Sequence, residues 1–375
     1  MNTLRLDGVP VTVFALSLLP LWLPVLLGEA ATRGTRARVT LGVTVALVLA
    51  SFAVNGPVAF GALAVGLTLQ AFGAGTDSRL IRSTLLASAT CTVTTALALV
   101  FAWPVIAFVA SVLAVTLRVG VMPLHAGAVA LGDRSPAAQT QQLGATLVLV
   151  LAHLRFTDHI GFAYDVAPML VVLGAVATLV PGVIALVQPD LRGFYRTATA
   201  MHGGMILASL GAAGRGHEAA ALMVVLTTAF AVGGLGLLIV ALEARVGPVR
   251  FDRRGGRVQA FPRLAAGFAL FAAAGVAMPG TSGFIADDLM LHALWGESVA
   301  ATVMIILGAA ALAVASLRAY SATFLGPAVA SVAPDLNGRE RAATTVLVVA
   351  LLILGIVPGL LLTPADVFLN LSDAP

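Results

Sequence analysis

The sequence predicts an all-α polytopic membrane protein with about twelve transmembrane helices, two of which are broken. Hydrophobic residues make up 59% of the 375 residues and charged residues only 10%, whereas a soluble protein of this size carries roughly 25% charged residues. The apolar residues form successive runs of about 20, which is the length a helix needs to cross a bilayer. The arginines fall in alternate connections between these runs.

The predicted spans, in chain order, are 9–28, 39–54, 56–74, 83–102, 104–121, 136–156, 165–187, 195–212, 217–243, 262–292, 299–325 and 341–362. The first span is long enough to cross the membrane and lacks a small-residue cleavage site, so we expect a helix there and not a cleaved signal peptide. The span 262–292 is too long for one straight crossing, and Pro279 and Gly280 should break it. We expect Pro181 to kink 165–187 in the same way.

Charge in the connections supports this count. Of the 21 basic residues, all arginines, three fall on one side of the predicted bundle and sixteen on the other. The three are Arg5, Arg155 and Arg215; the sixteen are Arg33, Arg36, Arg38, Arg79, Arg82, Arg134, Arg192, Arg196, Arg245, Arg250, Arg253, Arg254, Arg257, Arg263, Arg339 and Arg341. The positive-inside rule makes the arginine-rich side cytoplasmic and directs both termini outward. A wrong helix count would have scrambled this alternation.

The longest connection, about 244–262, carries the densest arginine cluster. We interpret it either as a topology anchor on anionic lipid or as a docking site for a cytoplasmic subunit. The sequence has one cysteine, Cys91, and contains neither a phosphate-binding GxxxxGK[ST] motif nor histidines at metal-ligand spacing. We therefore expect no metal, no cofactor, no nucleic-acid partner and no catalytic chemistry within this chain.

Arg118 is the most unusual residue of the sequence. It lies near the end of the apolar run 104–121, where a permanent cation costs about 3 kcal/mol on insertion scales. The following Met122-Pro123-Leu124-His125 begins an irregular stretch that ends at Pro136, and a second irregular stretch runs from Pro279 to Asp288. Paired interruptions in the two halves of a transporter are the best sequence pointer to its ion or substrate site.

The candidate residues of a proton or ion path share a polar side chain within or beside these interrupted spans: Arg118, His125, Gln142, His202, Asp287, Asp288 and Arg318. An intramembrane carboxylate is a candidate for proton transfer, although Asp287 or Asp288 could instead cap a helix turn. His202 titrates near physiological pH, and Gln142 could equally be an interhelical hydrogen-bonding group. Arg318 lies near a span end, where it could instead snorkel to the interface.

Several segments, taken in order, resemble the proton-pumping membrane subunits shared by respiratory complex I, multisubunit Na+/H+ antiporters and membrane-bound hydrogenases. The matching segments are Leu6-Asp7-Gly8-Val9, Arg118 to His125, Ser135-Pro136, Asp190-Leu191-Arg192, Pro279 to Asp288, and Arg318 with Gly326. The resemblance implies a single transmembrane domain over 1–375, with two inverted five-helix repeats at about 39–156 and 165–325. The spans 9–28 and 341–362 flank the repeats. Compared with the family, the chain is expected to lack the first two helices and any lateral C-terminal helix.

The resemblance also exposes large departures. The family's seventh-helix lysine becomes Arg118, its fifth-helix glutamate falls near Ala62, and its twelfth-helix lysine falls near Asp287. Arginine stays charged, so Arg118 cannot easily pass a proton, and its carboxylate partner is expected to be missing.

Three functions remain open at this stage. The first is a proton-conducting or ion-translocating subunit of a multi-subunit complex in the bacterial cytoplasmic membrane, with other membrane subunits, a cytoplasmic subunit at 244–262 and lipid as partners. Such a complex would be related to the NADH–quinone oxidoreductases or, as another case, to systems for inorganic-carbon uptake. The second is a structural subunit that keeps the fold without conducting. The third is a transporter of a small anion, with Arg118 as the anion ligand.

Overall fold

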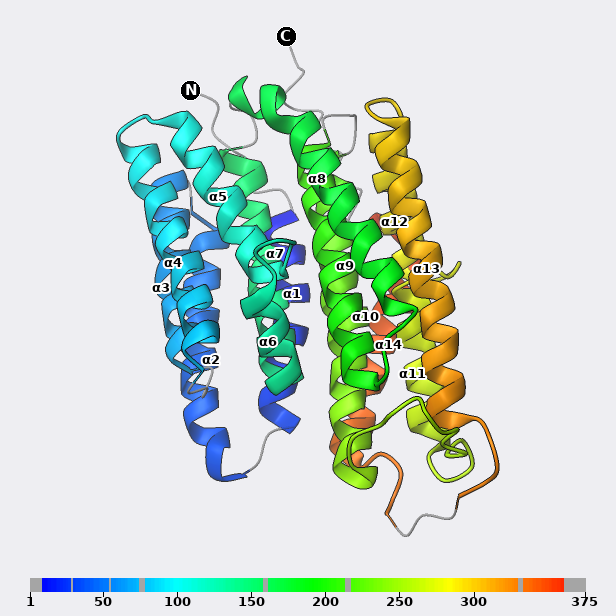
Figure 1. The fold of residues 1–375 in the computed structure, drawn as a ribbon. Helices are drawn as coiled ribbons and strands as arrows, with labels where there is room; N and C mark the ends of the chain where they lie inside the picture. Colours follow the sequence, from blue (N-terminus) through cyan, green and yellow to red (C-terminus); the bar gives the residue numbers. More distant parts are fainter. Residues whose placement is uncertain are drawn as a thin grey trace.

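Helices account for nearly all of the regular structure in the part of the chain that the computed structural model describes, residues 9–27, 30–53, 55–73, 78–157, 161–212, 217–329 and 333–360. Fourteen helices are found there: α1 (Val9–Leu27), α2 (Ala30–Ser51), α3 (Gly56–Gly73), α4 (Arg79–Val100), α5 (Pro104–Val119), α6 (Ala126–Arg134), α7 (Pro136–Phe156), α8 (Gly161–Ala185), α9 (Leu191–Gly211), α10 (His217–Val246), α11 (Pro262–Ala274), α12 (Ser282–Trp295), α13 (Val299–Phe324) and α14 (Gly338–Ile356). Their axes run roughly along one direction (Figure 1).

Each predicted span falls on a helix of the described residues, although the limits differ, most of all for α2, which begins at Ala30 and not at residue 39. The span 262–292 is divided into α11 and α12, as its Pro279-Gly280 sequence predicts, whereas α8 continues through Pro181 as one helix. The short helix α6 was not predicted. Five helices are long and apolar enough to cross a membrane by themselves, at Gly56–Gly73, Arg79–Val100, Asp165–Ala185, His217–Val246 and Val299–Phe324. The expected motif at Leu6-Asp7-Gly8 lies outside the described residues.

Local sequence explains where many helices begin. The side chain of Ser135 accepts a hydrogen bond from the Ala138 amide, and Asp190 accepts one from the Gly193 amide, so each satisfies a free donor of the following first turn. At α14, Asn337 and Glu340 form a reciprocal capping box. These caps fix the positions at which α7, α9 and α14 enter the bundle.

Two breaks interrupt the helical segments. The first separates α5 from α6, where Gly120 ends α5 with φ of +78°, a left-handed conformation that glycine adopts without steric cost. The second separates α11 from α12 and contains Gly280 with φ of +88°. Irregular backbone at this depth is tolerated only where protein or water satisfies it, so both breaks are expected to have polar surroundings.

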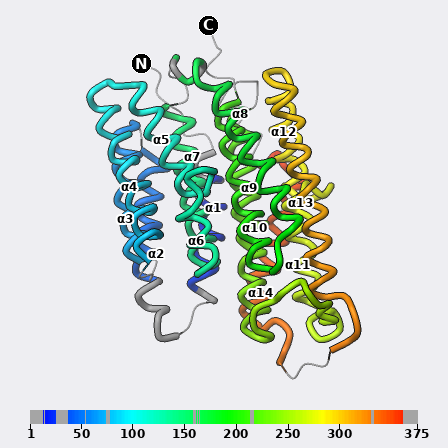
Figure 2. The backbone as a smooth tube through the Cα atoms, viewed as in Figure 1, coloured from blue at the N-terminus to red at the C-terminus, as the bar shows by residue number. Residues whose placement is uncertain are grey.

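The described arginines of the connections gather at one end of the bundle. The connections 186–190, 247–261, 325–329 and 333–337 lie at the lower end in Figures 1 and 2, together with the start of α4 and, in Figure 1, the start of α2. The connections 101–103 and 296–298 lie at the upper end (Figure 1). We call the lower end the arginine-rich end.

The surface and the interior are inverted relative to a soluble protein. Large apolar side chains face outward, with Leu317 at 70% and Ile356 at 71% exposure. Buried positions include many polar residues, among them Arg118, Gln139 and Gln142. Such a pattern fits a helical bundle whose outside contacts lipid and whose inside holds polar groups.

Candidate functional site

Arg118 lies in the last turn of α5, directly before the first break, and its side chain is fully buried. Its Nε donates to Thr146 Oγ1 at 3.1 Å, and its Nη2 donates to Gln70 Oε1 at 2.5 Å and to the Gln142 carbonyl at 3.3 Å. The Gln142 amide in turn donates to the Arg118 carbonyl at the end of α5. Helices α3, α5 and α7 therefore meet around one guanidinium group.

The partner of Arg118 is an uncharged amide. The side chain of Ala62 has no group that could replace the carboxylate that we expected to be missing; instead the amide of Gln70, two turns further along α3, accepts a hydrogen bond from Arg118. No carboxylate pairs with Arg118 within the described residues. The sequence analysis missed Gln70, although it is the only glutamine in the apolar run 56–74 and could have been noticed for that reason.

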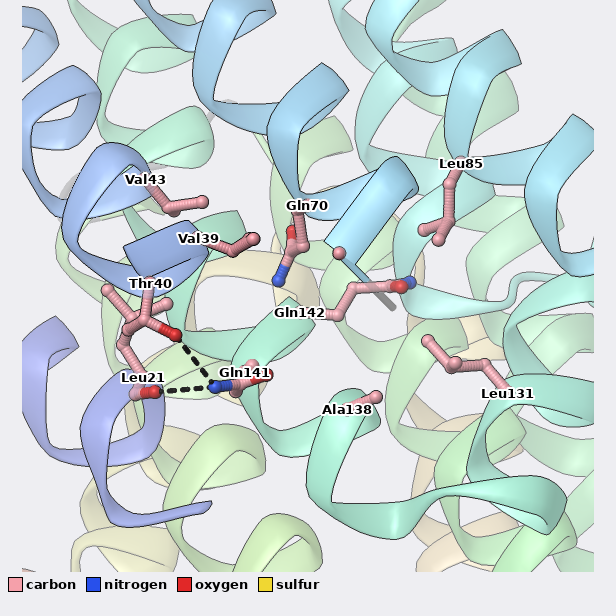
Figure 3. A pocket seen from close by; sticks show the side chains of 11 residues that line it. Leu21, Val39, Thr40, Val43, Gln70, Leu85, Leu131, Ala138, Gln141 and Gln142 are labelled. Atoms are coloured by element: carbon pink, nitrogen blue, oxygen red, sulfur yellow. Dashed lines mark hydrogen bonds between the residues drawn. The ribbon is translucent and has the colours of Figure 1, made fainter. Parts of the chain in front are cut away.

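A cavity of about 20 Å³ lies next to this cluster, and about 10–15 Å³ is enough for one water molecule. Helices α1, α2, α3, α4, α6 and α7 line it, and Figure 3 shows the Gln70 amide directed into it. On the opposite wall, Gln141 Nε2 donates to the Leu21 carbonyl at 3.0 Å and to Thr40 Oγ1 at 3.3 Å. Several polar atoms nearby, Gln70 Nε2, Arg118 Nη1 and Gln142 Oε1, are buried and have no hydrogen-bond partner.

Asp287 lies in the second turn of α12, just beyond the second break. Its side chain is partly buried and has no hydrogen bond or ion pair in the described part of the chain. Ser282, at the start of the same helix, shares a hydrogen bond of 2.9 Å with Thr227 of α10. The second break therefore carries an unpaired carboxylate beside a small hydroxyl pair.

Helix α9 contacts both breaks through two consecutive residues. A side chain on Gly203 would place its Cβ 2.6 Å from the Val119 carbonyl, so α9 touches the first break. The ring of the buried His202 lies against Gly275 at the second break, with Cε1 3.6 Å from the position of a Cβ on that glycine. Nδ1 of His202 is 2.8 Å from the Ala198 carbonyl. His202 therefore stands between the two interruptions.

The remaining predicted site residues lie elsewhere. His125 begins α6 and is only partly buried, with Nδ1 3.2 Å from the Pro123 carbonyl. Asp288 faces outward and lies 3.4 Å from His292 Nδ1. Arg318 Nη1 donates to the Leu186 and Gln188 carbonyls at 2.7 and 2.9 Å, which caps the end of α8. The structure thus brings Arg118 and Gln142 together and keeps these three apart from them.

The connection 247–261 is held against the bundle. The Leu191 amide donates to the Val249 carbonyl at 2.9 Å, and the Val258 amide donates to the Phe324 carbonyl at 3.0 Å. Arg253 and Arg254 remain exposed, and Arg250 is engaged with Asp252 at 3.5 Å. The loop therefore presents cations at the arginine-rich end.

Comparison with known proteins agrees with this architecture. The family model described as NADH:quinone oxidoreductase/Mrp antiporter, transmembrane region, matches residues 81–313. The chain belongs to this family of membrane subunits, and it is an integral membrane protein. The match contains both breaks, Arg118, His202 and Asp287.

The individual relatives share about 30% or less of their residues with this chain over the matched regions. NADH-quinone oxidoreductase subunit 13 of Thermus thermophilus is 30% identical over 259 residues, which is 67% of this chain and 54% of the relative. Subunit M of Rhodobacter capsulatus is 28% identical over 192 residues, which is 50% of this chain and 38% of the relative. The chain thus matches roughly a third to a half of the length of these curated relatives.

Solved structures share the fold. A chain of respiratory complex I from Thermus thermophilus with bound NADH superposes with a TM-score of 0.81 at 23% identity, covering 98% of this chain and 86% of the other. A chain of the Mrp complex from a Dietzia species gives a TM-score of 0.78 at 18% identity, covering 96% and 83%.

Proposed function

We propose that the chain is a proton-translocating membrane subunit of a multi-subunit complex of the complex I or Mrp type. One observation carries the proposal: a buried cation at the first break and an unpaired carboxylate at the second are joined by a helix that touches both breaks. Charges at membrane depth are costly and mark ion paths. Membership of the family supports the assignment to a multi-subunit complex. Any redox chemistry of that complex would belong to its other chains.

Within this proposal, Asp287 is the group that gains and loses the proton. It is partly buried and has no hydrogen bond or ion pair within the described residues, so no partner fixes its charge. Arg118 acts as a fixed charge because a guanidinium retains its proton. Its hydrogen bonds to Gln70, Gln142 and Thr146 hold that charge in place.

His202 is the proposed relay between the halves. The His202 ring lies at the second break, and the next residue, Gly203, contacts the first break. A small movement of either break would therefore displace the same turn of α9. An imidazole can accept and release a proton near neutral pH. We assign Gln142 to positioning Arg118, and assign no path role to His125, Asp288 or Arg318.

The fold supports twelve crossings as two inverted repeats, 39–156 and 165–325, flanked by 9–28 and 341–362 within one domain. In each repeat the fourth of five segments is the broken one, α5–α6 and α11–α12. The first repeat starts at the arginine-rich end and the second at the opposite end (Figure 1). The positive-inside rule then places the arginine-rich end in the cytoplasm of a bacterium, with both termini outward.

The proposed partners are other membrane subunits, lipid, and a cytoplasmic subunit on the 244–262 loop, whose Arg253 and Arg254 are exposed. A second function is favoured by one specific observation. Because the side chain that bonds Arg118 from α3 is the amide of Gln70 and not a carboxylate, a structural subunit that does not conduct is the second candidate.

Proton flux into liposomes separates the two functions. The chain is reconstituted alone and with its candidate partner subunits, and acidification is followed with a pH-sensitive dye. Asp287→Asn should abolish flux because the amide cannot carry a proton, and Arg118→Ala should lower it strongly. Asp288→Asn serves as the matched comparison and should retain flux, since Asp288 faces outward beside His292. If Asp287→Asn and Arg118→Ala conduct like wild type, the proton path is refuted; if no assembly conducts, the structural function holds.

A further inference from the structure

The guanidinium of Arg118 is surrounded by neutral oxygens. Its three acceptors are an amide oxygen, a hydroxyl and a backbone carbonyl. Hydrogen bonds to these groups satisfy donors but leave the net positive charge unbalanced inside a low-dielectric bundle. A buried charge without a counter-charge costs several kcal/mol, so the site as described lacks a negative group.

Donor capacity is also left over at this position. Arg118 Nη1 and Gln70 Nε2 are both buried without a hydrogen-bond partner. Arg118 is completely buried and Gln70 is 8% exposed, so bulk solvent does not satisfy either atom. Buried donors without partners usually indicate a missing ligand or water. Two of them around one cation favour a ligand that accepts hydrogen bonds and carries negative charge.

The adjacent cavity provides the space. Two of its lining residues, Gln70 and Gln142, are themselves hydrogen-bond partners of Arg118. Its volume of about 20 Å³ suits an occupant close to water in size. None of the eleven lining residues is acidic, so the wall carries no formal negative charge. In Figure 3 the Gln70 amide nitrogen points into this space.

The approach to the cavity is positively charged. Gly73, which lines it, is the last residue of α3 at the arginine-rich end, and Val39 of α2 packs against this glycine. The exposed Arg38, Arg79 and Arg82 lie at the same end on α2 and α4. Clefts with one sign of charge concentrate ions of the opposite sign.

We infer that Gln70, hydrogen-bonded to the Arg118 guanidinium behind it, forms a binding site for a small monovalent inorganic anion such as chloride, in the cavity between α1, α2, α3, α4, α6 and α7. The anion accepts a hydrogen bond from Gln70 Nε2. It balances the charge of the Arg118 guanidinium, which lies on the other side of the Gln70 amide. It replaces a fixed carboxylate with an exchangeable one-charge ligand. This inference goes beyond the proposed function and does not require the chain to conduct protons.

Chloride-dependent thermal stability tests the site. The full chain in nanodiscs is unfolded at increasing sodium chloride, with sodium gluconate holding the ionic strength constant, because gluconate is too large for the cavity. A ligand that binds only the folded state raises Tm in a saturable way. We expect this rise for wild type, and Gln70→Leu should raise the half-saturating chloride concentration by about ten-fold or more, because the variant removes a hydrogen bond to a charged group.

Two charge variants decide the matter. Arg118→Gln removes the cation and should abolish the chloride effect. Gln70→Glu places a carboxylate beside the guanidinium and should raise Tm without chloride while removing the chloride dependence. Arg155→Gln, an arginine bonded to the Ser51 and Ala53 carbonyls, should keep the wild-type dependence. Equal Tm values of wild type in chloride and gluconate would overturn the site, as would an unchanged dependence in Gln70→Glu, even if Arg118→Gln fails to fold.

Discussion

Arg118 retains its charge in the bundle because neutral oxygens from three helices converge on it. A hydrogen bond from a charged donor contributes about 1.5–3 kcal/mol, so the three bonds to Gln70, Gln142 and Thr146 offset part of the cost of the buried cation but supply no counter-charge. Their contribution depends on the geometry of the three acceptors. Removing any one acceptor should therefore destabilise the buried Arg118 side chain.

The role of Arg118 as a fixed charge predicts the behaviour of a lysine at the same position. Arg118→Lys keeps the positive charge but loses the planar, multi-donor geometry. Proton flux should be largely retained in Arg118→Lys and strongly reduced in Arg118→Gln, as measured in the same liposome assay. If both variants lose flux equally, hydrogen-bonding geometry and not charge is what the site requires.

Sequence alone could identify Arg118, because a lone charge in an apolar run is visible without a structure. It could not identify Gln70 as its partner, since that pairing depends on how α3 packs against α5 and α7. The position of Ala62 correctly predicted the absence of a carboxylate there. It did not predict that an amide two turns away would reach the guanidinium.

At the scale of elements, the two breaks could be predicted because proline and glycine act locally. Pro279-Gly280 divides α11 from α12, and Gly120 ends α5. The short helix α6 was missed because nine residues are too few for a membrane span. The position of α9 between the breaks could not be predicted from the sequence either, because only the packing of the helices places Gly203 against Val119.

That contact predicts the effect of a small substitution. Gly203→Ala introduces a Cβ 2.6 Å from the Val119 carbonyl, so α9 must move away from the first break. Overpacking of this kind costs about 1–3 kcal/mol, and we expect a lower Tm in nanodiscs. Gly61→Ala is the control, because its Cβ meets nothing within 4 Å; it should leave Tm unchanged or slightly higher. A wild-type Tm for Gly203→Ala would show that α9 is free to shift.

At the scale of the whole molecule, charge asymmetry organises the bundle. The arginines of the described connections lie at one end, while the outer surface between the ends is apolar. The sequence could predict this arrangement because alternation of charge reports the side of each connection. It needs no knowledge of packing, so each predicted span falls on a helix even though the partners of single side chains could not be predicted.

The orientation of the bundle gives the final prediction. With Cys91 replaced by alanine, single cysteines are introduced as Arg253→Cys at the arginine-rich end and Trp103→Cys at the opposite end, both at exposed positions. If the arginine-rich end is cytoplasmic, a membrane-impermeant maleimide added to intact cells should label position 103 and spare position 253. After the membrane is permeabilised, both should react. Labelling of position 253 in intact cells would reverse the orientation and place the exposed arginines of 247–261 outside, where a cytoplasmic subunit could not dock.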